Sequence, residues 1–179
     1  ISLDFVNVSI YRLLTDIYEL TTAARLDVNN DAISKNKYCF KLEQSADYNK
    51  NILDNAKEIL NENSGFKARL IEKTLDSLYT LQVIDPTKLP KVSLNTKHST
   101  EGGGPYFKGM KITTYDIIYY LENTVMLPVI DKTGINFAFD MELNWSLENP
   151  KTLNEALKKY GFQLLKSNVP EKIVLLEIR

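Results

Sequence analysis

The sequence is poor in the residues that build disulfides, redox pairs and metal sites. It contains one cysteine, Cys39, and one histidine, His98. Within this chain, these counts exclude a disulfide, a CxxC redox pair and a Cys/His zinc site, and we expect no metal and no cofactor. Cys39 lies in the alternating segment KYCFKLE, and we predict that it is a buried or half-buried structural residue. His98 lies in a polar loop, where we predict that it is solvated.

Net charge and long apolar segments are also nearly absent. The chain has 22 lysines and arginines and 23 aspartates and glutamates, which leaves a formal net charge of -1. This balance gives no electrostatic footprint for nucleic acid, so no nucleic-acid partner is expected. No apolar segment approaches the roughly 18 residues that a membrane-spanning helix needs, so we expect no membrane span in this piece.

A repeated order of elements is present instead. Strand, helix, strand, helix and two further strands are predicted once in each half. The segment VSIYRLL (8–14) aligns with ITTYDII (112–118), YCFKLE (38–43) with FDMELN (139–144), and Gly65-Phe66 with Gly161-Phe162. We therefore predict an α+β fold of two tandem related β-α-β-β-α-β-β units. They cover residues 1–85 and 105–179, a connector covers 86–104, and the two units can pack as one structural domain.

Each half is expected to end in a β-hairpin. FKARLIEK is predicted to pair with SLYTLQVID, and FQLLKS with EKIVLLEIR. The three glycines of the connector, 102–104, are interpreted as linker or turn residues. They do not form a phosphate-binding loop, because no GK[ST] follows them.

The segment PVIDKTGIN (128–136) raises the question of catalysis, because ion-pumping ATPases are phosphorylated at the aspartate of D-K-T-G-T. Here Ile135 replaces the last threonine, and no later acidic loops for Mg²⁺ are recognisable. We interpret Asp131 as a turn residue, with Gly134 supplying a positive φ. Asp140 and Glu142 are interpreted as the solvated face of a strand, not as an acid–base pair.

Two adjacent tyrosines form a candidate partner surface. Neighbouring helical residues point about 100° apart, so Tyr119 and Tyr120 cannot both lie deep in one core. An exposed tyrosine at this place is typical of a protein interface, although core packing remains the alternative for the aromatic residues of this half as a group.

The second half resembles a known family along KITTYDIIYYLE, PVIDKTGINFAFDMELNW and TLNEALKKYGFQLLKSNVPEKIVLLEI. These segments resemble the bacterial soil-associated domain family of unknown function, and the first half resembles it more loosely. Phe137 departs from a glycine that is frequent there. The matching motif runs from Asp131 to Trp145, and we expect its residues to be structural. They are Asp131, Lys132, Thr133, Gly134, Phe139, Asp140, Leu143 and Trp145.

Each half also resembles the short N-terminal domain of secretins and TonB-dependent receptors, which is an envelope docking module. The soil-associated domain is in some proteins joined to a thioredoxin-like domain. These resemblances imply a periplasmic or cell-surface location. The chain begins at Ile1 without a signal peptide, and we interpret it as a piece of a longer product.

Three functions follow as hypotheses. The first is a non-catalytic envelope module that docks an unknown envelope protein, for example by strand addition at a sheet edge. The second is a small-ligand or glycan-binding domain that uses Tyr119, Tyr120 and Trp145. The third is a hydrolase with a site between the halves. It would bring together at least two of Asp131, Asp140, Glu142 and His98 in a polar cleft.

Overall fold

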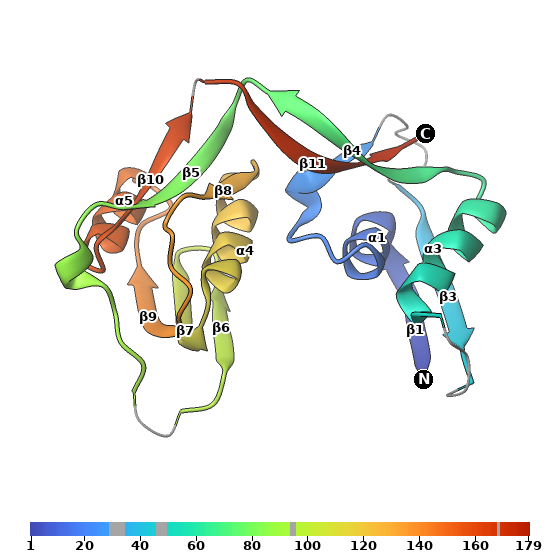
Figure 1. Ribbon diagram of the computed structural model, residues 1–179, viewed down its shortest axis with the longest axis horizontal. Coiled ribbons are helices and arrows are strands. Elements are labelled where there is room, and N and C mark those ends of the chain that lie inside the picture. Colours follow the sequence, from blue (N-terminus) through green and yellow to red (C-terminus); the bar gives the residue numbers. More distant parts are fainter. Residues whose placement is uncertain (29–34, 46–49, 94–95, 168) are drawn as a thin grey trace. The chain divides into compact units, whose positions relative to one another are not determined.

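The computed structural model describes residues 1–28, 35–45, 50–93, 96–167 and 169–179 (Figure 1). The fold is α+β, with helices and several small sheets, as the sequence predicts. The chain divides into two compact units. The first unit comprises Ile1–Thr74 together with Lys172–Arg179, and the second comprises Leu75–Glu171. No helix in the described residues is long and apolar enough to cross a membrane.

The first unit contains two sheets and two described helices, α1 and α3. In one sheet β1 pairs antiparallel with β3, and in the other β11 lies between β2 and β4. The bounds are β1 Ser2–Ser9, α1 Ile10–Ile17, the 3-10 helix η1 Ala23–Arg25, β2 Leu26–Val28, β3 Lys37–Glu43, α3 Ile52–Asn63, β4 Ala68–Leu75 and β11 Glu171–Ile178.

Helix α1 organises the core of this unit. Its apolar residues recur at helical spacing, and all four are fully buried: Ile10, Leu13, Leu14 and Ile17. Ser9 caps the helix, because its hydroxyl accepts a hydrogen bond from the Arg12 amide at 3.3 Å. Strand β11 closes the core with Leu176 and Ile178, both of which are also fully buried.

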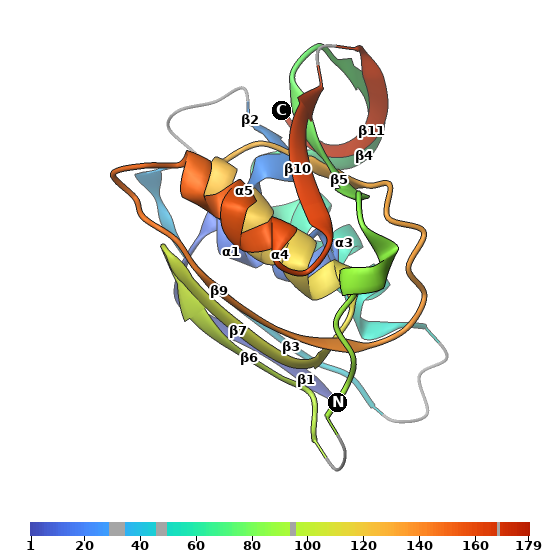
Figure 2. The same ribbon diagram turned by 90° about the vertical axis from the view of Figure 1, so that its left-hand side faces the viewer.

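The second unit places a layer of helices between two sheets. Helices α4 and α5 lie on one face of the sheet β6-β7-β9 (Figure 2), and they also contact strands of the sheet β10-β5-β8. The bounds are β5 Leu78–Val83, the 3-10 helix η2 Pro86–Lys88, β6 Ser99–Gly103, β7 Tyr106–Ile112, α4 Thr114–Val125, β8 Val129–Asp131, β9 Phe139–Asn144, α5 Lys151–Lys158 and β10 Phe162–Ser167.

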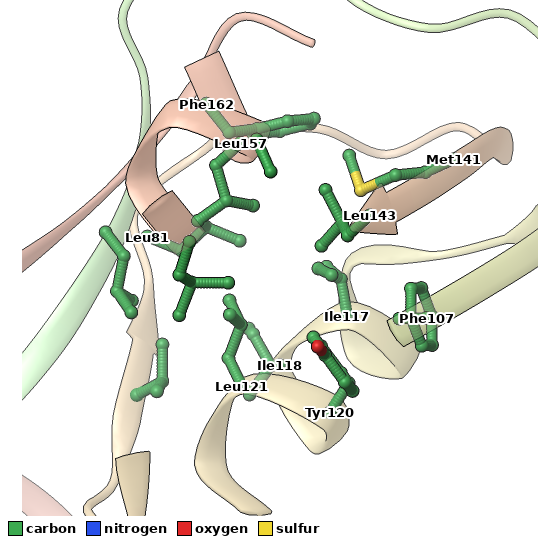
Figure 3. Packing of buried hydrophobic residues seen from close by; sticks show 14 of the residues in the cluster. Leu81, Phe107, Ile117, Ile118, Tyr120, Leu121, Met141, Leu143, Leu157 and Phe162 are labelled. Carbon is green, nitrogen blue, oxygen red and sulfur yellow. The ribbon is translucent and has the colours of Figure 1, made fainter. Parts of the chain in front are cut away.

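The core of the second unit draws on both sheets and both helices (Figure 3). Phe139 of β9 and Phe162 of β10 lie 5.7 Å apart between ring centroids, and Leu81 of β5 belongs to the same buried cluster. Thr113 and Asp116 form the capping box that their spacing predicts. The sequence spacing of Thr152 and Glu155 predicts a second capping box, but none forms there, because α5 begins one residue before Thr152 and Pro150 takes the N-cap position.

The strand pairing corrects both expected hairpins. Consecutive strands β4 and β5 do not pair with each other, and neither do β10 and β11. Instead, β5 pairs antiparallel with β10 and parallel with β8, while β11 lies between β2 and β4 (Figure 1). In each of these two sheets, the central strand therefore comes from the other half of the sequence.

The reason for this error is that alternation identifies a strand but not its partner. The hydrogen bonds between paired strands join backbone groups, which every strand has. A strand from a distant segment can therefore pair as well as the next strand in the sequence, provided that its apolar face points into the core. The exchange also moves residues 172–179 into the first unit, whereas the sequence division carried the second repeat to residue 179. The expected connector 86–104 contains strand β6, which the sequence analysis missed.

A matching irregularity occurs in both units. The β1–β3 register shifts near Asn7, which has φ +54° and donates its amide to Cys39 Sγ at 3.4 Å. The β7–β9 register shifts near Lys111, which has φ +50° and donates its amide to Asp140 Oδ1 at 2.6 Å. Cys39 is exposed, so the prediction of a buried or half-buried cysteine is wrong. Its sulfur is nevertheless a hydrogen-bond acceptor for the irregular strand.

The exchanged strands predict which unit a core substitution weakens. Leu176 and Leu81 are both fully buried, so Leu→Ala at either place should cost about 2–5 kcal/mol. Leu176→Ala should speed amide exchange in α1 and α3, and Leu81→Ala should speed it in α4 and α5, as measured by hydrogen exchange with mass spectrometry. The observed pairing would be wrong if Leu176→Ala instead sped exchange in α4 and α5, and Leu81→Ala sped it in α1 and α3.

Candidate functional site

A groove of about 630 Å³ lies between strand β6 and one face of helix α4 in the second unit. Its lining comes from β6, from the turn that follows β6 and from α4. The lining residues are Thr100, Glu101, Gly102, Gly103, Gly104, Phe107, Tyr115, Asp116, Tyr119, Tyr120, Asn123 and Thr124.

The β6 wall of the groove includes a position that only glycine can occupy. Gly102 lies opposite Phe107, whose buried ring lines the groove. Gly102 has φ +135°, and a Cβ there would lie 2.4 Å from the Tyr106 carbonyl oxygen of β7. Any other residue at this position would run into the backbone of the neighbouring strand.

Tyr120 forms the inner wall of the groove and holds the turn after β6. Its hydroxyl donates to the Gly104 carbonyl at 2.8 Å and accepts a hydrogen bond from Trp145 Nε1 at 2.6 Å. Its ring stacks on Phe107 with centroids 4.6 Å apart, and the two rings lie side by side in Figure 3. Burial raises the pKa of the Tyr120 hydroxyl, and the bond from Trp145 opposes that rise.

The neighbouring tyrosines lie at the mouth of the groove. Tyr115 is 56% exposed and Tyr119 is 52% exposed, whereas Tyr120 is only 6% exposed. This contrast confirms that the two adjacent tyrosines point into different surroundings. Tyr115 and Tyr119 are four residues apart on α4, so their side chains are neighbours on one helix face.

Asp116 links the helix start to the segment before β6. Its Oδ2 accepts hydrogen bonds from the Thr113 amide at 2.8 Å and the Thr113 hydroxyl at 3.1 Å. Its Oδ1 lies 3.2 Å from His98 Nε2. His98 is exposed, as the sequence analysis predicted, and it has a carboxylate partner that the sequence did not reveal.

Three other strand edges in the described residues are covered by hydrogen bonds from side chains. The Tyr160 hydroxyl donates to the Glu142 carbonyl at 3.0 Å and accepts from its amide at 3.1 Å, on the outer side of β9. Asn154 bonds both backbone groups of Leu164 on β10, each at 2.8 Å. Asn61 does the same at Ala68 on β4. Proteins commonly cover strand edges in this way.

Strand β6 differs from these edges. Within the described part of the chain, β7 is the strand that pairs with it, and its other side ends the sheet. All five of its residues, Ser99–Gly103, are exposed. It therefore presents a strand edge beside an aromatic groove.

The alternation of the ladder shows which backbone groups of β6 point outward. Glu142 directs its amide and carbonyl to Tyr160, so its opposite residue Lys108 directs its own backbone groups toward β6. Lys108 lies opposite Glu101, which makes this a hydrogen-bonded pair. The amide and carbonyl groups of Thr100 and Gly102 consequently point away from the sheet.

The D-K-T-G segment forms a turn outside the groove. Asp131 Oδ1 accepts hydrogen bonds from the Thr133 amide at 2.8 Å and the Thr133 hydroxyl at 2.7 Å. Gly134 has φ +67°, and Lys132 pairs with Glu171. These contacts are those of a self-bonded Asx turn, in which the Asp131 carboxylate holds its own loop.

The rest of the predicted motif builds the second unit. Phe139 and Leu143 are fully buried, and Trp145 bonds Tyr120. Asp140 accepts hydrogen bonds from the backbone amides of Lys111 at 2.6 Å and Ser93 at 2.8 Å, and these bonds hold its pKa below the usual range. Asp131, Asp140 and Glu142 do not line the groove.

Comparison with known families identifies one matching family. The model of a family described as "Protein of unknown function (DUF3738)" matches residues 12–166. The chain belongs to this family. No curated protein and no solved structure matches it significantly. The DUF3738 match includes β6, α4 and the D-K-T-G turn, so the groove lies inside the matched region.

Sequence analysis of this DUF3738 chain found Tyr119 and Tyr120 but missed β6 as the other wall. The only signal for β6 was STEGG before a turn at Gly104-Pro105, and its glycines resemble a linker. The hydrogen bond between Trp145 and Tyr120 had no sequence signal, because neither periodicity nor spacing reports a contact across 25 residues.

Asp140 gives the DUF3738 chain a pH-dependent bond network. Because its pKa is lowered in the fold, its contribution to stability is present above its unfolded value of about 3.9 and is lost as pH falls through the folded value. Asp140→Asn should lower the melting temperature at pH 7 but not at pH 2.

The control for this prediction is Glu142→Gln, an exposed substitution on the same strand that should change stability by no more than about 0.5 kcal/mol. An Asp140→Asn deficit of equal size at both pH values would contradict the assigned role.

Proposed function

We propose that this chain is a non-catalytic docking module of the cell envelope that binds an extended segment of a partner protein by strand addition to β6. The observation that supports the proposal is the uncovered edge of β6 beside the groove. In strand addition, main-chain hydrogen bonds supply affinity and pockets for alternate side chains supply specificity. Both features occur together at β6.

The outward backbone groups provide the docking line. Thr100 and Gly102 each offer an amide and a carbonyl to an incoming strand, while Glu101 is already bonded to β7. Every second side chain of that strand faces the α4 side, where Tyr115 and Tyr119 are exposed. Tyrosine is enriched at protein interfaces because its ring buries apolar area while its hydroxyl stays hydrogen-bonded.

The envelope location and an attached thioredoxin-like domain rest on the resemblances described above. The tandem relation of the two units, like that of secretin and TonB short N-terminal domains, is part of the same proposal. It is supported by the irregular strand that each unit carries at matched positions, with Cys39 in one and Asp140 in the other as the acceptor. The short N-terminal domains of secretins and TonB-dependent receptors are docking modules, and this role is the one proposed for the present chain.

Glycan or small-ligand binding is the second candidate, favoured by the exposed rings of Tyr115 and Tyr119. Two of its three predicted rings are less suitable. Tyr120 is buried, and Trp145 uses its Nε1 to bond Tyr120. Of the three aromatic residues predicted for glycan binding, only Tyr119 therefore exposes its ring at the groove.

Strand addition predicts an alternating response to backbone methylation. A displayed random library of nine-residue segments is selected on the protein, and the best binder is resynthesised with one N-methyl amide at a time. Methylation should weaken binding about 10-fold or more at every second residue, where the amide bonds β6, and little at the residues between. Fluorescence anisotropy gives each dissociation constant.

Two exposed aromatic positions provide matched controls. Tyr119→Lys should reduce binding, whereas Phe137→Lys should not, because Phe137 is 46% exposed in the same unit but does not line the groove. A binder that is insensitive to methylation, or a library that yields no binder sensitive to Tyr119→Lys, would contradict strand addition at β6.

A further inference from the structure

Space in the groove and a charge on the β6 edge restrict which segment can dock there. The space lies beside Gly102, which lines the groove and has no side chain of its own. The charge belongs to Glu101, the only ionisable residue of the strand Ser99–Gly103. We propose that the docked segment places an aromatic side chain over Gly102 and a basic residue beside it, opposite Glu101. This inference rests on the proposed strand addition.

The preference for an aromatic residue follows from the side chains that surround Gly102. Gly102 is flanked on the β7 side by Phe107, and Phe107 stacks on Tyr120. An aromatic residue on the incoming strand would cover the glycine from its other side, as aromatic residues do across from edge glycines. It would also meet Tyr119, whose ring is 52% exposed at the groove mouth. Aromatic pairs add stability beyond the area that they bury.

The basic preference follows from the ladder. Glu101 is hydrogen-bonded to β7, so its pairing with an incoming strand would be of the non-hydrogen-bonded kind, in which opposite side chains approach more closely. Lys108 already lies opposite Glu101 on the inner side. A second basic residue on the outer side would complete a Lys–Glu–Lys/Arg row on the face away from α4, and opposite charges across strands stabilise pairing.

The groove beside this edge also offers no basic side chain among its described lining residues. They include Asp116, and also Glu101, whose side chain is on the face away from α4, but no lysine or arginine. His98 lies against Asp116, and Lys108 is the cation opposite Glu101. A segment that brought an aspartate or glutamate opposite Glu101 would meet a like charge, which destabilises a cross-strand pair.

The test uses displayed nine-residue segments with a threonine–valine background and three adjacent randomised positions. Selection on the wild-type protein should enrich an aromatic residue directly next to lysine or arginine. Selection on Glu101→Lys should retain the aromatic residue and replace the basic one by aspartate or glutamate. For resynthesised segments, exchanging the charge should change the dissociation constant about 3- to 5-fold, with opposite sign on the two proteins.

Glu148→Lys is the matched control, because it makes the same charge change at an exposed residue outside the groove. It should leave the basic preference intact. Binders without an aromatic–basic pair, or with the same charge preference on Glu101→Lys, would overturn this inference while strand addition stood. A library without any groove-dependent binder would overturn the inference together with the proposed function.

Discussion

Each unit depends on one central strand that the other half of the sequence supplies. Strand β5 lies between β8 and β10, and β11 lies between β2 and β4. Both strands carry fully buried leucines, Leu81 and Leu176, into the cores of the units that receive them. A strand bonded on both sides satisfies all of its backbone groups, whereas an edge strand leaves half of them to water. The exchange thus determines which strands become edges.

The groove is a consequence of how the second unit manages its edges. Tyr160 and Asn154 cover β9 and β10 with side-chain hydrogen bonds, whereas β6 is left beside a helix. The groove lies beside Gly102, and Tyr120 holds the following turn by donating a hydrogen bond to Gly104. An edge with room beside it and a rigid wall behind it suits an extended segment, because little ordering remains to be done on binding.

The sequence predicted the elements better than their partners. Helical spacing in α1, the capping box at Thr113 and the alternation of Phe139, Met141 and Leu143 are local signals, and the structure contains all three. The pairing of β5 with β10 is non-local, and the same alternating face fits either a hairpin or an exchange. Strand β6 was missed because glycine, which occupies two of its five positions, has low strand propensity.

In the candidate site, too, the local features could be predicted from the sequence and the non-local contacts could not. The angle between successive helical residues separated Tyr119 from Tyr120, but it did not indicate that Gly102 would face them. The D-K-T-G motif is shared with phosphorylated ATPases, but here its aspartate accepts hydrogen bonds from Thr133 and holds a turn. A motif that recurs in a family can reflect a folding requirement, and Asp140 illustrates this by bonding the irregular strand at Lys111.

The most direct test of the account is amide hydrogen exchange, by NMR, along β6 in the free protein and with a bound segment. In the free protein the Glu101 amide should exchange slowly, and the Thr100 and Gly102 amides should exchange fast. A bound segment should slow Thr100 and Gly102 and leave Glu101 unchanged, because the new strand bonds only the outward groups. If Thr100 and Gly102 stay fast while the segment is bound, then β6 is not the docking edge.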